Sequence, residues 1–323
     1  ITVHRVFSPP HYLARYITVL EVARLMRKIR PDIIHAHFVS HFGIVAALYS
    51  LIWRFRPIVL TAWGAYTLRT ARLFKRRLIR FALRRADGIT CDGDNMVELL
   101  VGMGADPQKI NLIYFGTDIQ KFSPSNKNGT LKQKLGIAGS STVVSLRVLK
   151  PLYDIESLVR SIPLVLKEVP EVKFIIAGDG EQRKYLEDLA EVLGVATSVR
   201  FVGMIANDEL PQYLTSSDVY VSTSLSDAGI AASTAEAMAC ELPVVVTDFG
   251  DNRKWVEDDI NGFIVPPKNP ETLAAKITYL LQHEDKRRDF GRTNREVIME
   301  KNNWEKEMGK VEKLYNQLIE RCR

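Results

Sequence analysis

Apolar runs rich in β-branched residues alternate with amphipathic segments through the second half of the chain. The apolar runs predict strands, at residues 142–148, 172–177, 199–202, 219–222 and 244–247. Between them, apolar residues recur at helical spacing, at 155–167, 182–193 and 270–282. Continuous apolar strands separated by helices indicate a parallel sheet that is covered by helices on both faces.

The first part of the chain shows the same alternation less completely. Strands are expected at 33–36, 58–62, 88–91 and 110–114, with a helix over 19–30 and an edge or remnant strand over 1–6. A polar stretch at 123–134 (SPSNKNGTLKQK) joins the two parts. We therefore expect two α/β domains, over 1–122 and 123–303, and a charged helix over 304–323 that packs back toward the first domain.

The first domain is expected to lack its beginning. No glycine-rich turn between a strand and a helix comes first, and the chain begins with Ile1 rather than Met. The longest apolar run, 43–53, ends at Arg54, whereas a membrane span needs about 20 apolar residues. Neither a transmembrane helix nor a secretory signal is therefore expected.

Composition favours a folded protein of the reducing cytoplasm. Hydrophobic residues make up 46% and charged residues 25% of the 323 residues, which is ordinary for a globular protein of two domains. The cysteines Cys91, Cys240 and Cys322 are far apart and form no C-x-x-C pair. A disulfide framework and a zinc site are therefore not expected.

Positive charge is concentrated in the first part of the chain. Residues 1–124 contain 18 Lys and Arg against 8 Asp and Glu, and much of this excess lies between Arg69 and Arg85 (RTARLFKRRLIRFALRR). In a helix, apolar positions 74, 78 and 81 would pack on the sheet and a stripe of cations would face solvent. The alternative is an anionic partner, either a lipid surface or a nucleic acid. No recognised nucleic-acid-binding motif accompanies the charge, so a membrane is the expected partner.

The stretch 222–248 combines a strand end, a glycine-containing loop, a helix and an apolar strand. In an open parallel sheet, loops at the carboxyl ends of strands build the ligand site. A helix that begins near Ser233 and Thr234 would point its first N–H groups at a phosphate, and small residues such as Gly229 allow close approach. Glu236 either completes an S-x-x-E capping box with Ser233 or accepts hydrogen bonds from ribose hydroxyls.

Short motifs in a fixed order resemble glycosyltransferase family 4, whose members are retaining enzymes with the GT-B fold. The run 234–248 (TAEAMACELPVVVTD) resembles the E-A-M-A-x-G-x-P-V-V signature of that family. The other matches, in chain order, are 31–37 (PDIIHAH), 58–64 (IVLTAWG), 116–124 (GTDIQKFSP), 174–180 (FIIAGDG), 199–203 (VRFVG) and 261–267 (NGFIVPP). Each motif is weak alone, but the ordered series covers nearly the whole chain.

The resemblance implies an α/β protein of the GT-B type, with two facing Rossmann-like domains, parallel sheets and a cleft between the domains. It implies transfer of a hexose from a UDP- or GDP-sugar to an acceptor hydroxyl, with retention of configuration and without a metal ion. The acceptor would be a lipid-linked or surface glycan, which fits a cytoplasmic enzyme peripheral to the membrane.

The resemblance also assigns roles to residues of the second domain. Arg147 and Lys150 would neutralise the diphosphate, supported by the helix start at Ser233 and Thr234, although Arg147 could instead be an ordinary surface arginine after a strand. Glu236 would hold the ribose.

Further positions are assigned by their match to the family motifs. Gly178 would belong to the nucleotide site, and the backbone of Met204 and Ile205 would contact the base, unless these two residues are a plain strand end. His35 and His37 share one face of a strand, and a packing role is expected for one of them. His37, like His41, is a candidate cleft residue. No Cys or carboxylate accompanies these histidines at metal spacing, so no metal site is expected.

Four positions depart from the family pattern, and one of them is Phe115, in place of the Asn of N-G-V-D. The first Glu of E-x7-E is Ala228, unless Asp227 supplies the carboxylate with a shift of one residue. The lysine of R-x4-K is Leu152, for which Lys150 can substitute, and Trp63 replaces the histidine of T-x-H-G. Two alternatives therefore stand beside the enzyme. One is a degenerate nucleotide-sugar binder without turnover, and the other is a basic-surface protein that binds membrane or nucleic acid.

Overall fold

A computed structural model describes residues 14–63, 68, 72–126, 129–227 and 229–322 of the chain. The expected strand over 1–6, the cation Arg69 and the family position Ala228 lie outside these residues. The chain divides into two compact units. Unit 1 comprises Ile1–Ile113 with Gly309–Arg323, and unit 2 comprises Tyr114–Met308. The first division thus falls between Ile113 and Tyr114, whereas the sequence analysis placed it between residues 122 and 123.

Unit 1 contains a parallel sheet whose strands lie in chain order, β1-β2-β3-β4, among its described residues. The strands are β1 (Ile34–His37), β2 (Ile58–Ala62), β3 (Gly88–Cys91) and β4 (Ile110–Leu112). The helices are α1 (Ala14–Ile29), the π-helix η1 (Phe38–Gly43), α2 (Ile44–Trp53), α4 (Leu73–Arg85), α5 (Asp94–Gly102) and the 3-10 helix η2 (Pro107–Lys109).

Both faces of the unit 1 sheet are covered. On one face, Val59 and Ile113 form a core cluster with Leu314 and Leu318 of the last helix, α14 (Trp304–Cys322). On the other face, η1 packs on β2, and α2 and α4 pack beside η1. Strands β2 and β3 are buried along their whole length, which explains why they read as uninterrupted apolar runs.

Unit 2 contains a larger parallel sheet, in the order β10-β9-β8-β5-β6-β7 among its described residues. The strands are β5 (Thr142–Leu146), β6 (Lys173–Ala177), β7 (Val199–Gly203), β8 (Val219–Ser222), β9 (Val244–Thr247) and β10 (Gly262–Val265). The α-helices are α6 (Thr130–Lys134), α7 (Ile155–Glu168), α8 (Arg183–Val192), α9 (Leu210–Thr215), α10 (Ala232–Ala239), α11 (Asn252–Trp255), α12 (Pro270–Gln282) and α13 (Glu284–Lys301). The 3-10 helices are η3 (Pro124–Asn126), η4 (Pro151–Tyr153) and η5 (Ala196–Ser198).

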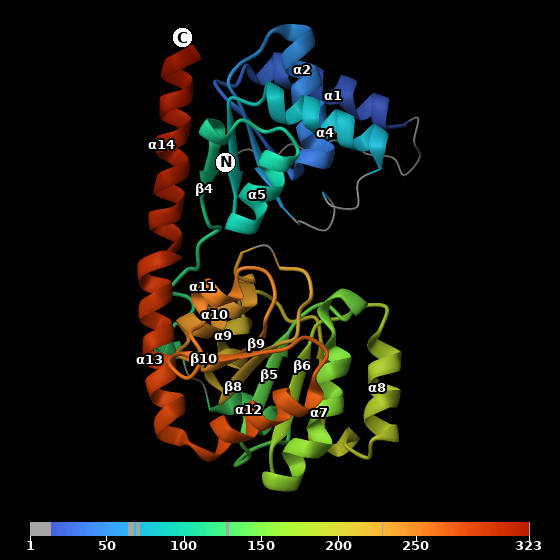
Figure 1. The fold of residues 1–323 in the computed structure, drawn as a ribbon, viewed down its shortest axis with the longest axis vertical. Helices are drawn as coiled ribbons and strands as arrows, with labels where there is room; N and C mark the ends of the chain where they lie inside the picture. Colours follow the sequence, from blue (N-terminus) through green and yellow to red (C-terminus); the bar gives the residue numbers. More distant parts are fainter. Residues whose placement is uncertain (1–13, 64–67, 69–71, 127–128, 228, 323) are drawn as a thin grey trace. The chain divides into compact units, whose positions relative to one another are not determined.

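Alternate residues of each strand in unit 2 enter two separate cores. Val143 and Val245 pack with α7, α8 and α12, whereas Val144 and Val244 pack with α9, α10 and α11. In Figure 1, α7 and α12 lie side by side on one face of this sheet and α10 and α11 lie on the other. The expected parallel sheet covered on both faces is therefore present.

The sheet order of unit 2 positions a ligand site. Strand β5 lies between β6, the next strand in sequence, and β8. The chain runs outward from β5 to β7 on one side, crosses back, and runs outward from β8 to β10 on the other side. In open parallel sheets, ligands bind at the carboxyl ends of the two strands where the order reverses. A ligand site is therefore expected at the residues that follow Leu146 of β5 and Ser222 of β8.

The two ends of unit 2 are hydrogen-bonded to each other. The N–H of Tyr114 donates to Oε2 of Glu307 at 2.9 Å, and the N–H of Gly116 donates to Oδ1 of Asn302 at 3.1 Å. The N–H of Trp304 donates to the carbonyl of Thr117 at 3.0 Å. The chain therefore enters and leaves unit 2 at one place.

Candidate functional site

Arg147 directly follows β5 and is buried, with only 9% of its side chain exposed. Its Nη2 lies 2.6 Å from Oδ1 of Asp227 and 3.1 Å from Oγ of Ser224, in the loop after β8. Its Nη1 lies 3.5 Å from Oγ of Ser233, and its guanidinium lies 4.5 Å from the centre of the Tyr153 ring. The structure therefore places a cation at the point where the strand order reverses, and Arg147 is no ordinary surface arginine.

Asp227 neutralises this buried cation. Its side chain is 13% exposed. Burial lowers the pKa of Arg147, but the charge of Asp227, the hydrogen bond to it and the nearby Tyr220 and Tyr153 together raise that pKa by more, so the net direction is upward. Asp227, expected as a substitute for the first Glu of the family pattern, thus contacts Arg147 itself.

Helix α10 begins two residues earlier than the expected capping box requires. Its N-cap is Ala231, without a side-chain hydrogen bond, so Ser233 is the second helical residue. The capping box of Ser233 and Glu236 was therefore a wrong prediction. The fully buried Tyr220 explains why, because its hydroxyl needs a partner and lies 2.8 Å from Oγ of Ser233. Thr234 is buried, and its N–H donates to the carbonyl of Ala231.

Glu236 lies on α10, half-buried, about one turn beyond Ser233. Burial raises its pKa to about 7, and the positive charge of Lys121 opposes this shift only in part. A carboxylate in a poorly solvated position accepts hydrogen bonds from hydroxyls favourably. Glu236 is thus free of the capping role and suited to a polyhydroxylated ligand.

Gly178 holds the turn that carries Arg147. Its φ is 117°, and a Cβ at this position would lie 2.1 Å from the carbonyl oxygen of Arg147. The N–H of Arg147 donates to the carbonyl of Ala177, and that of Leu149 donates to the carbonyl of Asp179. Gly178 therefore acts on the site by permitting this close approach, which also ends β5 two residues before the expected strand end.

The Arg147 centre consists of Arg147 and the residues linked to it, Asp227, Ser224, Ser233, Tyr153 and Tyr220. The remaining expected residues of unit 2 follow the carboxyl ends of strands β5, β7 and β8. Lys150 is exposed and precedes the short helix η4. Met204 is 72% exposed and Ile205 half-buried, just after β7. Gly229 is buried in the loop between Asp227 and α10.

In unit 1, the two histidines of β1 have different surroundings. Nε2 of His35 lies 2.5 Å from Oγ1 of Thr61, and Nδ1 contacts the hydroxyl of Tyr315. Burial, followed by the charge of His37, lowers the pKa of His35 to about 4, so it is neutral. His35 is therefore the packing histidine. His37 is exposed, and its Nδ1 lies 3.0 Å from Nε1 of Trp63.

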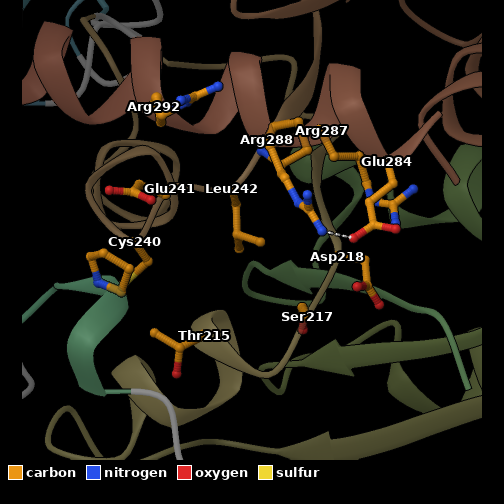
Figure 2. A pocket seen from close by; sticks show the side chains of 12 residues that line it. Thr215, Ser217, Asp218, Cys240, Glu241, Leu242, Glu284, Arg287, Arg288 and Arg292 are labelled. Carbon is orange, nitrogen blue, oxygen red and sulfur yellow. Dashed lines mark hydrogen bonds and ion pairs between the residues drawn. The ribbon is translucent and has the colours of Figure 1, made fainter. Parts of the chain in front are cut away.

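A separate pocket of about 520 Å³ lies at the opposite, amino end of the unit 2 sheet. Residues before β8 and β9 line it together with arginines of α13, as Figure 2 shows, and Arg288 is paired there with Glu284. None of the expected nucleotide-site residues lines this pocket. Within the described residues, no group of three or more His, Cys, Asp or Glu is arranged to hold a metal ion, and no helix is long and apolar enough to cross a membrane.

Comparison with known families decides what kind of protein carries this centre. The family model described as glycosyl transferases group 1 matches residues 128–297, and the model described as glycosyl transferase 4-like matches residues 1–93. The chain belongs to the group 1 glycosyltransferases. The family resemblance expected from the motifs is thereby confirmed.

Named relatives of this glycosyltransferase act on nucleotide sugars and lipids. The UDP-Gal:alpha-D-GlcNAc-diphosphoundecaprenol alpha-1,3-galactosyltransferase of Escherichia coli is 26% identical over 77% of this chain and 66% of its own length. The alpha-monoglucosyldiacylglycerol synthase of Streptococcus pneumoniae is 30% identical over 72% of this chain and 57% of its own. The chain spans about half to two thirds of the length of such curated relatives.

A solved structure confirms the fold. HepE of Anabaena, in complex with UDP and glucose, matches 96% of this chain and 84% of its own with a TM-score of 0.83 and 25% identity. The glycosyltransferase described here therefore has the GT-B fold.

Sequence reasoning missed several members of the Arg147 centre. Ser224 belongs to a run of hydroxyl residues (STS) after an apolar strand, a signal that could have been used. Tyr153 and Tyr220 gave no signal, because their roles depend on contacts between elements far apart in sequence.

Proposed function

We propose that this glycosyltransferase transfers a hexose from a UDP- or GDP-sugar to an acceptor hydroxyl, with retention of configuration and without a required metal ion. Family membership supports glycosyl transfer from a nucleotide sugar. The UDP bound to HepE and the UDP-Gal in the name of the E. coli relative favour a UDP-sugar as donor.

The buried Arg147 carries the proposal. It lies at the reversal of the strand order, next to the first turn of α10, and both features favour negative charge there. In the proposed reaction, Arg147 stabilises the charge that develops on the leaving diphosphate, and the exposed Lys150 adds a second cation. Glu236 accepts hydrogen bonds from the ribose, and Met204 and Ile205 lie against the base.

A panel of donors tests this function. UDP-glucose, UDP-galactose, GDP-mannose and ADP-glucose are added to the protein, and thermal stabilisation and release of nucleoside diphosphate are measured. Arg147→Ala should weaken UDP binding far more than uridine binding, and Lys150→Ala should do the same less strongly. Binding without turnover would favour the degenerate binder. Equal losses for UDP and uridine would show that the diphosphate is held elsewhere.

We further propose that the acceptor is lipid-linked and that α4 attaches the enzyme to an anionic membrane surface. The α4 residues Lys75, Arg76, Arg77, Arg80 and Arg84 are exposed, and the helix contains no acidic residue. Leu73 and Phe74, at its start, are 82% and 74% exposed, whereas Ile79, Ala82 and Leu83 are buried. The expected packing of position 74 on the sheet was therefore wrong.

This arrangement supports a peripheral membrane contact at the cytoplasmic face. Exposed apolar residues next to exposed cations are typical of helices that lie at a membrane interface. The two named relatives support the same acceptor class, because their names include a diphosphoundecaprenol and a diacylglycerol.

A further inference from the structure

Three rings meet at the carboxyl end of β1 in unit 1. His37 ends the strand, and its ring centroid lies 4.4 Å from that of His35, with the planes at 29°. Trp63, which follows β2, lies beside His37 with the two planes at only 12° and the centroids 6.2 Å apart. Because Nε1 of Trp63 is 3.0 Å from Nδ1 of His37, the indole N–H points along the plane of the imidazole.

This contact decides which nitrogen of His37 carries the hydrogen. An indole N–H can only donate, so Nδ1 of His37 accepts. In a neutral imidazole, a nitrogen that accepts has no hydrogen, and the hydrogen is therefore on Nε2. His35 covers one face of the ring, and His37 as a whole is exposed. His37 thus presents an N–H donor to its open side.

The segment directly after β1 carries further exposed aromatic residues. The π-helix η1 begins directly after His37, and π-helical turns occur frequently at functional sites. Phe38, its first residue, has a φ of 69°, which is costly for a residue with a side chain. Phe38 and Phe42 are 48% and 53% exposed. Sugar rings combine hydroxyl oxygens at their edges with apolar C–H faces, so a donor among aromatic rings matches their chemistry.

We propose that Trp63 is a positioning residue that holds His37 as an Nε2–H donor toward an oxygen of the acceptor sugar. The aromatic residues of η1 pack against the C–H face of that sugar. This inference rests on the proposed glycosyl transfer. It assigns His37 to acceptor binding and not to proton abstraction, because a nitrogen that already carries a hydrogen cannot take another proton from the acceptor hydroxyl.

The tautomer is tested on the whole chain without turnover. In protein labelled with ¹⁵N-histidine, two-bond ¹⁵N–¹H correlation spectra distinguish Nε2–H from Nδ1–H. We expect His37 to be Nε2–H in the parent. The variant Trp63→Phe keeps an aromatic ring and removes the indole N–H donor. In this variant the ¹⁵N chemical shift of Nδ1 of His37 should change. An Nδ1–H form in the parent would overturn the inference.

The role of His37 as a hydrogen-bond donor is tested with a matched pair of substitutions. His37→Gln keeps an N–H donor near the position of Nε2, whereas His37→Glu offers only an acceptor and a base. UDP-glucose serves as donor, and methyl α-glucoside, methyl α-galactoside and methyl α-mannoside serve as acceptor probes. We expect the Gln variant to retain most of the transfer and the Glu variant to lose it. A Glu variant that equals or exceeds the Gln variant contradicts the inference.

Trp63→Phe separates positioning from general damage. The KM for the acceptor probe should rise roughly threefold to tenfold, by more than kcat changes, because one hydrogen bond to His37 is lost. Its affinity for UDP should equal that of the parent. An unchanged acceptor KM would exclude a positioning role.

Failure of this inference and failure of the proposed function can be told apart. If the parent binds UDP-glucose but transfers to none of the probes, the proposed transfer fails for these acceptors. The methyl glycosides are then titrated into labelled protein while the signals of His37 and the Trp63 indole are followed. Shifts at both residues support the site, and no shift at either residue rejects it.

Discussion

At the scale of single residues, the Asp227 carboxylate competes with the proposed diphosphate for Arg147. Nη2 of Arg147 is 2.6 Å from the Asp227 carboxylate, so a diphosphate must share or displace that contact. Asp227→Asn keeps the shape and removes the charge. We expect UDP affinity to rise roughly threefold to tenfold, about 1 kcal/mol, while uridine affinity stays unchanged. Titration calorimetry with both ligands measures this difference.

The same substitution should destabilise the fold, because it leaves a buried guanidinium without its carboxylate. Asp188→Asn is the control, since it removes the carboxylate of a surface pair with Lys184 on α8. Should Asp227→Asn weaken UDP binding, Asp227 would be a ligand contact and not a competitor.

Glu236 connects the proposed ribose site to pH. Its pKa is about 7 in the folded chain and near 4.5 in the unfolded chain. Between these values the unfolded chain loses a proton that the folded chain keeps, so stability falls as pH rises. Above pH 7 the folded chain has lost this proton too, and stability no longer falls with pH. Glu236→Gln should therefore match the parent near pH 4 and exceed it at pH 8, by about 1–3 kcal/mol in urea unfolding.

Donor binding gives a second measurement of the same residue. The ionised carboxylate is the better acceptor for ribose hydroxyls, so the parent's UDP affinity should rise as pH passes 7. Glu236→Gln should bind UDP more weakly at pH 8 although its fold is more stable. The exposed Glu296→Gln serves as control. Equal UDP affinity in parent and Glu236→Gln would remove the ribose role.

At the scale of elements, α4 combines exposed cations with exposed Leu73 and Phe74. Each cation near an anionic leaflet contributes about 1 kcal/mol, so several give reversible attachment that salt weakens. One variant tests this attachment by changing four arginines of α4 to Gln: Arg76, Arg77, Arg80 and Arg84. It should no longer sediment with anionic liposomes.

A second variant separates charge from apolar insertion. Leu73→Ser with Phe74→Ser keeps all cations, and its attachment should weaken by a smaller, salt-independent amount. Equal recovery with neutral and anionic vesicles at all salt concentrations would rule out the mechanism. Tighter binding to DNA than to liposomes would support the nucleic-acid alternative.

At the scale of the whole molecule, each unit has its own core, so the two can unfold separately. Leu318 of α14 packs in the unit 1 cluster with Val59 and is only 5% exposed. Leu318→Ala should destabilise unit 1 by about 2–4 kcal/mol. In calorimetry, the melting temperature of unit 1 should fall in this variant, whereas UDP should raise the melting temperature of unit 2. Lys313→Ala, at an exposed position of the same helix, should change neither.

Elements were predictable from the sequence where one apolar run decides them, whereas the Arg147 centre was predictable only in part: Arg147, Asp227 and Ser233 were named, and their contacts were not. Strands β2, β8 and β9 and helix α12 lie where the apolar pattern placed them, because burial alone sets their limits. The short strand β10 was not expected, since it has only four residues and begins with Gly262, a residue type that is depleted in strands. The end of β5 depends on Gly178, and the start of α10 on Tyr220, and neither contact leaves a local pattern.

Unit 2 is an insert in the chain of unit 1, and the hydrogen bond between Tyr114 and Glu307 joins its two ends. A module whose entry and exit lie together can be exchanged without altering the path of the host, and domain insertions succeed at such places. Unit 2, the proposed nucleotide-binding unit, is therefore an exchangeable module. We expect that replacing Tyr114–Met308 by the same segment of a relative with another donor would give a chimera that keeps unit 1 and changes the sugar that it transfers.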